Sequence, residues 1–305
     1  MKLVAITGGL GFIGTNLVPL LMQSTGASVR ILDNSSNPSG EFEDRPGIEL
    51  LKGDIRDADR VERLVEGADA VVHLAAHTRV IDSIEQPALN FEQNTHGTFN
   101  VLEAMRKKGV QRLINASTGG AILGEVQPPI NEEMPAKPAS PYGASKLAAE
   151  GYCWAYAQSY GLETASLRFS NVYGPYSRNK SSVVATFLKQ IRDNSSVTVY
   201  GDGSQTRDYL YVGDLVQGVV KALKGSAVGV FQLGSGQPTS VNELILKIRE
   251  ITGADFTVRN EGFRAGEVIH THCDISKARQ ALNFNPSVDI VRGVDLTWQW
   301  FRQSA

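Results

Sequence analysis

The 305-residue chain has few cysteines, no long apolar run and no excess of charge of either sign. Its two cysteines, Cys153 and Cys273, are far apart and form no C-x-x-C pattern, which favours a reduced, cytoplasmic interior over a disulfide framework. No apolar stretch reaches about 18 residues, so we expect neither a signal peptide nor a membrane span. The 30 basic and 32 acidic residues give a formal net charge of −2, which argues against nucleic acid or an acidic membrane as a partner.

What the chain does have is an alternation of short apolar strands and helices in its first half. Unbroken apolar strands that alternate with helices are typical of a parallel sheet covered on both faces. The predicted strands are 3–6, 29–32, 48–51, 70–74, 112–116 and 164–169. The predicted helices are 12–23, 57–65, 98–108 and 142–160.

Beyond about residue 172 the pattern loosens into Ser-, Asn- and Gly-rich turns. We therefore expect an α/β protein with a Rossmann-type doubly wound parallel sheet and a smaller C-terminal α/β substrate lobe. The cofactor domain is predicted at 1–173, with 206–233 returning to it, and the lobe at 174–205 and 234–305. Segments 211–223 and 230–233 are expected as late sheet elements, and the aromatic tail 298–301 as a helix that packs on the lobe.

Three glycines, Gly8, Gly11 and Gly14, follow the first predicted strand and open a helix. Such glycines allow a tight turn and a close approach of the backbone to a pyrophosphate. Asp33 ends the second strand, 33 − 14 = 19 residues after Gly14, where a carboxylate would accept hydrogen bonds from an adenosine ribose. Its charge would repel a 2′-phosphate, so we expect NAD rather than NADP. An ordinary turn at Asp33-Asn34 is the alternative.

The segment Tyr142-Gly-Ala-Ser-Lys146 places a phenol and an ammonium on one face of a helix. A neighbouring cation favours a phenolate, which could take a proton from an alcohol while a hydride leaves its carbon for a nicotinamide. Ser140 and Pro141 are predicted as the N-cap and first residue of this helix. Either Ser117 or Thr118, after the preceding strand, could bind a reacting oxygen and pass the proton.

Taken together, these elements resemble the extended short-chain dehydrogenases/reductases, specifically the NAD-dependent nucleotide-sugar epimerases. The resemblance covers almost the whole chain. The segments that carry it are 7–14, Asp33, 53–55, 73–76, 117–120, 142–146, 168–175 and 201–209.

The resemblance implies that Thr118, in preference to Ser117, is the catalytic hydroxyl beside Tyr142, and that Lys146 also holds the nicotinamide ribose. Asn94 matches a position near the nicotinamide, although a helix-starting asparagine is an equal alternative. The residues expected to contact NAD are Gly8, Gly11, Phe12, Ile13, Gly14, Asp33, Asn34, Asp54, Ile55, Leu74, Ala75, Ala76, Asn94, Tyr142, Lys146 and Phe169.

The resemblance also implies a nucleotide-sugar site, in which Arg207, Arg264 and Asn171 bind the diphosphate, Glu267 a ribose hydroxyl and Tyr200 the base. Thr271 matches a position that limits the room around sugar C2 and is small enough here for an N-acetyl group. The full predicted set is Thr78, Ser117, Thr118, Gly119, Asn171, Tyr200, Arg207, Arg264, Glu267 and Thr271. Arg79 could reach an acidic substituent such as a uronate, or face water.

The expected reaction follows from what the family's dehydratases have and this chain lacks. In the family that this chain resembles, the 4,6-dehydratases carry an Asp-Glu pair directly after the catalytic threonine, for acid–base chemistry at C5 and C6. This chain has Gly119 and Gly120 there. What remains is 4-epimerisation of a UDP-hexose or UDP-N-acetylhexosamine, with a nucleotide-ketosugar reductase as the alternative. A catalytically silent NAD-binding scaffold would be expected to lose the catalytic groups. We further expect a homodimer through a four-helix bundle, to which each chain contributes helices 98–108 and 142–160, and no metal site despite His270 and His272.

Overall fold

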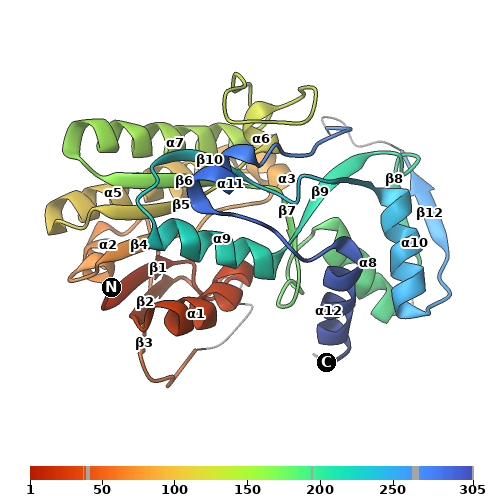
Figure 1. Ribbon diagram of the computed structural model, residues 1–305, viewed down its shortest axis with the longest axis horizontal. Helices are drawn as coiled ribbons and strands as arrows, with labels where there is room; N and C mark the ends of the chain where they lie inside the picture. Colours follow the sequence, from red (N-terminus) through yellow and green to blue (C-terminus); the bar gives the residue numbers. More distant parts are fainter. Residues whose placement is uncertain (37, 39–41, 194, 263–267, 304–305) are drawn as a thin grey trace.

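The computed structural model describes residues 1–36, 38, 42–193, 195–262 and 268–303, and its centre is a seven-stranded parallel sheet (Figure 1). The order is β10-β6-β5-β4-β1-β2-β3, with all neighbouring strands parallel. The chain reverses its direction of winding beside β1, and ligands of such sheets bind at the carboxyl ends of the strands there. The expected fold class is confirmed. The strands are β1 (Leu3–Thr7), β2 (Ser28–Asp33), β3 (Ile48–Lys52), β4 (Ala70–His73), β5 (Arg112–Thr118), β6 (Glu163–Phe169) and β10 (Gly229–Leu233).

Helices cover both faces of this sheet (Figure 1). One face packs against α1 (Phe12–Thr25) and α9 (Val212–Lys224), the other against α2 (Ala58–Val65), α5 (Gly97–Lys108) and α7 (Pro141–Tyr160). Ser140 caps α7 as predicted, because its Oγ accepts a hydrogen bond from the amide of Gly143 at 3.2 Å and Pro141 is the first helical residue.

The predicted sheet element at 211–223 is wrong, since all of it after Tyr211 lies in the helix α9. Its buried apolar side chains recur three and four residues apart, which is the period of a helix and not of a strand. The preceding strand, β9 (Thr206–Tyr211), runs into α9 without an intervening turn. The other predicted late strand, 230–233, is confirmed as β10.

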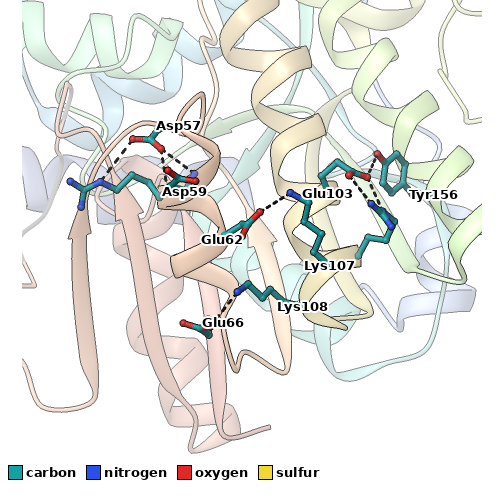
Figure 2. Close-up of polar contacts among 10 residues, drawn as sticks. Asp57, Asp59, Glu62, Glu66, Glu103, Lys107, Lys108 and Tyr156 are labelled. Carbon is teal, nitrogen blue, oxygen red and sulfur yellow. Dashed lines mark hydrogen bonds and ion pairs between the residues drawn. The ribbon is translucent and has the colours of Figure 1, made fainter.

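Exposed or partly buried polar contacts join α2, α5 and α7 (Figure 2). The Lys107 ammonium of α5 is 2.7 Å from Glu62 of α2, and Tyr156 of α7 donates a hydrogen bond of 2.6 Å to Glu103 of α5. Arg106 and Tyr156 together lower the pKa of Glu103 to about 2. Because exposed ion pairs contribute little, burial of the apolar sides of these helices is the main force that holds them together.

The second part of the structure lies beside the main sheet and has its own apolar core (Figure 1). It contains α8 (Val183–Arg192), α10 (Val241–Thr252) and α12 (Ile290–Gln303), the pair β12 (Val258–Glu261) and β8 (Val197–Tyr200), and the small sheet β11 (Pro238–Ser240), β9 and β7 (Asn171–Tyr173). The aromatic tail lies in α12, where Phe301 is fully buried, so the predicted C-terminal helix is confirmed.

Five short segments complete the described elements: α3 (Val80–Glu85), α4 (Pro87–Phe91), the π-helical turn Glu92–His96, α6 (Gly120–Leu123) and α11 (Ser276–Leu282). None of the helices in the described ranges combines the length and apolar character that crossing a bilayer requires. Nor do three or more His, Cys, Asp or Glu side chains in those ranges cluster as metal ligands would. His270 Nδ1 lies 3.1 Å from the Thr206 hydroxyl.

Candidate active site

A cavity of about 980 Å³ runs across the carboxyl ends of the central strands toward the second part of the chain. Most of the predicted site residues line it, although they come from segments far apart in the sequence. These are Gly8, Gly11, Phe12, Ile13, Gly14, Asp33, Asn34, Asp54, Ile55, Leu74, Ala75, Ala76, Thr78, Ser117, Thr118, Tyr142, Lys146, Phe169, Asn171 and Arg207.

The glycine turn after β1 brings backbone to the floor of this cavity, as a dinucleotide requires. Gly8 has a left-handed φ of +69°, and a Cβ built on it would lie 2.7 Å from the amide nitrogen of Ala75. Asp33 accepts hydrogen bonds from the amides of Leu10 at 3.0 Å and Ser35 at 2.8 Å. Its carboxylate therefore makes the turn and also lines the cavity. These residues fit an adenosine ribose and a pyrophosphate.

Substitution of Gly8 by alanine tests this close approach, and Gly26→Ala is its matched control. Gly26 has the same φ of +69°, but a Cβ there would meet nothing within 4 Å. Both variants carry the cost of a left-handed alanine, about 1 kcal/mol. Gly8→Ala should cost clearly more in free energy of unfolding, and it should weaken NAD binding as measured by calorimetry. Equal effects of the two variants would contradict the close approach.

A buried histidine organises the adjacent strand ends. His73 lies between the hydroxyls of Thr7, at 2.6 Å, and Thr98, at 3.0 Å. Burial lowers the pKa of His73 to about 3, so its ring is neutral. Since Thr7 also accepts a hydrogen bond from the Ala75 amide, this network fixes the loop that faces Gly8.

The predicted catalytic groups meet at the carboxyl end of β5. The Tyr142 phenol forms a hydrogen bond with Thr118, and the Lys146 ammonium donates to the carbonyl of Ala116 at 2.9 Å. Burial raises the pKa of Tyr142 to about 12, while the bond with Thr118 acts in the opposite direction. Desolvation of the phenolate thus outweighs the bond with Thr118, and the expected effect of Lys146 on this pKa stays a prediction.

Ser117 points to a different partner from Thr118. Its hydroxyl donates a hydrogen bond of 2.6 Å to Glu150, and Arg168 binds the same carboxylate at 2.8 Å. The Arg168 and Glu150 side chains are only 6% and 5% exposed. Ser117 is therefore tied into a buried ion pair beneath the site, which leaves Thr118 as the hydroxyl next to Tyr142.

The buried Lys146 ammonium loses its proton at a lower pH than an exposed lysine would. Burial lowers the pKa of Lys146 from 10.5 to about 8, and the charge of Glu150 acts against that shift. The folded protein therefore keeps the ammonium below about pH 8 and loses it above. The cost of burying this cation is fully present below pH 8 and is relieved as the pH rises toward 10.5.

We therefore expect kcat, measured at saturating substrate, to fall with an apparent pKa near 8 on the alkaline side. Lys146→Met should remove this limb together with most of the activity. An unchanged kcat up to about pH 10 would show that the charge of Lys146 is not required.

Asn94 lies within the π-helical turn and not at a helix start. Its amide donates to the carbonyl of His77 at 3.0 Å and to the Ser145 hydroxyl at 2.9 Å, and its oxygen accepts from the His77 amide at 2.7 Å. Asn94 does not line the cavity. It connects the loop after β4 to α7.

The remaining predicted substrate residues occupy several places. Gly119, Tyr200 and Thr271 are not among the cavity-lining residues. Thr271 nevertheless faces the loop after Thr118, because a Cβ built on Gly120 would lie 3.8 Å from its hydroxyl. Arg264 and Glu267 lie outside the described residues.

A family model covers most of the chain, including this site. The model of the NAD dependent epimerase/dehydratase family matches residues 4–234. The chain is a member of that family. The expected resemblance and the expectation of NAD as cofactor are confirmed.

Individual members of this epimerase/dehydratase family align over the whole chain. The UDP-glucose 4-epimerase of Mycolicibacterium smegmatis is 35% identical over 309 residues, which cover 98% of each chain. A Thermus thermophilus UDP-glucose 4-epimerase in complex with NAD is 37% identical, with a TM-score of 0.91 and 100% coverage of both chains. A Methanobrevibacter ruminantium UDP-N-acetylglucosamine 4-epimerase in complex with UDP-N-acetylmuramic acid has a TM-score of 0.94 at 29% identity, covering 100% of this chain and 99% of that one.

Two residues near the site of this epimerase-family chain were missed from the sequence. Glu150 follows Lys146 by four residues on the same helix, and that spacing was the available signal. Lys180 lies in the loop after β7 and lines the cavity. The Lys180 ammonium lies 3.4 Å from the Thr78 hydroxyl, a contact between segments far apart in the sequence. No local sequence pattern therefore marks Lys180 as a residue of the site.

Proposed function

We propose that this chain inverts C4 of a UDP-activated sugar through a transient 4-keto sugar, with no net consumption of NAD. One observation carries the proposal: Thr118, Tyr142 and Lys146 lie in the same cavity as the glycine turn. This shared cavity supports the proposal that NAD, held at the glycine turn, and the sugar, held beside Tyr142, lie next to each other.

In the proposed mechanism, Tyr142 removes the proton from the sugar O4 hydroxyl, with Thr118 in hydrogen-bond contact with its phenol. NAD, which the glycine turn and Asp33 would hold, would supply the hydride acceptor and donor at C4 and a positive charge that favours the Tyr142 phenolate. Lys146 stays anchored to β5 and keeps an ammonium beside the site.

After the sugar turns its other face to the cofactor, Tyr142 returns the proton to O4. Gly119 and Gly120 carry no ionisable group, which supports epimerisation over loss of water from C5 and C6.

The test is to incubate purified protein with single UDP-sugars, without added NAD, and to follow both C4 epimers by proton NMR. The proposal expects each epimer to be converted to the same mixture. Net consumption of NADH with a 4-keto sugar, and no interconversion, would instead favour the ketosugar reductase.

We propose further that Thr271 leaves room for an N-acetyl group. Its position opposite Gly120 supports this role. We expect UDP-N-acetylglucosamine to be turned over at least as well as UDP-glucose, and Thr271→Tyr to lower kcat/KM selectively for the N-acetylated sugar. Activity confined to the plain sugar would refute the size argument.

We also propose that residues 1–173, with 206–233, hold NAD, while 174–205 and 234–305 hold the nucleotide. A cytoplasmic homodimer through α5 and α7 is part of the proposal. Exposed aromatic side chains support this interface, since Phe99, Tyr152 and Trp154 are 36%, 42% and 57% exposed. Analytical ultracentrifugation should show a dimer that Trp154→Asp dissociates.

A further inference from the structure

Two cationic side chains, Arg79 and Lys180, line the same cavity as Tyr142 and Thr118 but take no part in the mechanism above. Arg79 is the N-cap residue of α3, and Lys180 lies in the loop that follows β7. The Lys180 ammonium donates to the Thr78 hydroxyl at 3.4 Å. The fold thus brings two positive charges together from segments about one hundred residues apart.

Arg79 lies near the start of α7, and the loop that carries Lys180 reaches across the cavity, since Asn179 donates a hydrogen bond of 2.9 Å to the carbonyl of Pro38. The Ser83 amide donates to the carbonyl of Arg79 at 3.1 Å, and the Ser83 hydroxyl accepts from the amide of Tyr142 at 3.2 Å. Arg79 is therefore one helical turn from the residue that holds the start of the catalytic helix. The adenosine end is marked instead by Asp33 on β2.

The charges of this pair are only partly compensated. Asp82 lies 3.7 Å from Arg79, whose side chain is 54% exposed. No carboxylate in the described ranges forms an ion pair with Lys180. Burial and the positive charge of Arg79 both lower the pKa of Lys180. A partly buried ammonium whose only neighbouring charge is positive is stabilised when an anion binds beside it.

The family resemblance assigns the diphosphate of a nucleotide sugar to a different cation. Arg207, on β9, lines the cavity from the second part of the chain. An anion carried by the sugar itself, beside Tyr142, could then meet Arg79 and Lys180. Ser181, Ser182 and Thr186 line the same region and offer uncharged donors.

We propose that Arg79 and Lys180 bind a carboxylate on the sugar, so that the substrate is a UDP-uronic acid. This inference rests on the proposed 4-epimerase function and narrows its substrate class. The carboxylate would accept charge-assisted hydrogen bonds from both cations and remove their mutual repulsion.

The test compares kcat/KM for UDP-glucuronate and UDP-glucose in the wild type, in Lys180→Met and in Lys189→Met. Lys189 is an exposed lysine of α8 outside the cavity and serves as the matched control. We expect the wild type to favour UDP-glucuronate, and Lys180→Met to lower the ratio of the two kcat/KM values by about 10- to 100-fold. Lys189→Met should leave that ratio as in the wild type.

Arg79→Met provides a second variant in case Lys180→Met fails to fold, and it should lower the same ratio. An equal loss for both sugars in Lys180→Met would overturn the inference, because it would assign Lys180 to the shared diphosphate or to the fold. Wild-type turnover of UDP-glucose or UDP-N-acetylglucosamine without UDP-glucuronate would also overturn it, while leaving the 4-epimerase function standing. Absence of C4 inversion with every sugar would overturn the proposed function itself.

Discussion

Tyr142→Phe is expected to lower kcat for C4 inversion by about 100- to 10,000-fold, the range in which general acid–base groups contribute. The variant keeps the ring that packs at the start of α7 and removes only the oxygen that bonds to Thr118. NAD affinity, which we propose depends mainly on the glycine turn and Asp33, should change little. Steady-state kinetics and calorimetric titration with NAD measure the two effects separately.

Tyr160→Phe is the matched control for this change. Tyr160 is the last residue of the same helix and is 54% exposed, far from the cavity-lining residues of α7. It should retain wild-type kcat. Similar kinetics in the two variants would mean that the phenol of Tyr142 moves no proton in the slow part of the reaction.

Glu150→Ala is expected to reduce the free energy of unfolding by about 3–5 kcal/mol, because it leaves Arg168 buried without its counter-charge. Arg168 donates to Glu150 at 2.8 and 2.9 Å, and one of its terminal nitrogens already lacks a partner. Urea unfolding followed by circular dichroism measures the loss. Glu250→Ala, at an exposed position on α10, should change it by less than about 0.5 kcal/mol.

A second substitution at the same position gives a catalytic readout that lost stability alone would not move. Glu150→Gln keeps the shape and removes the charge that raises the pKa of Lys146. The alkaline limb of kcat should therefore move below about pH 8, whereas a purely structural role for Glu150 would leave the limb in place.

Much of this arrangement could be predicted because parallel strands buried on both faces have unbroken apolar sequences, and because the glycine turn needs specific residues at fixed spacing. The strand ends at Asp33, Asp54 and Ala75 could be placed at one edge of the sheet for the same reason. The sequence does not show where β9 ends and α9 begins, because no turn separates them. The apolar residues of the two elements form one run, in which the helical period of 212–223 is not recognisable.

The rest depended on side chains that meet across the fold. Ser117 and Thr118 are adjacent in sequence, and only the packing of α7 on β5 shows that one bonds to Glu150 and the other to Tyr142. The pKa of Tyr142 likewise depends on burial, which sequence spacing does not give. Lys180 comes close to Thr78 only because the chain folds back after β7.

The central claim is that the hydrogen at C4 leaves and returns within one site while Tyr142 handles only the O4 proton. The most direct measurement uses a UDP-sugar labelled with deuterium at C4, incubated in ordinary water and analysed by NMR and mass spectrometry after both epimers have formed. The account predicts that deuterium stays at C4 of both epimers. Replacement of the label by solvent hydrogen during inversion would contradict it.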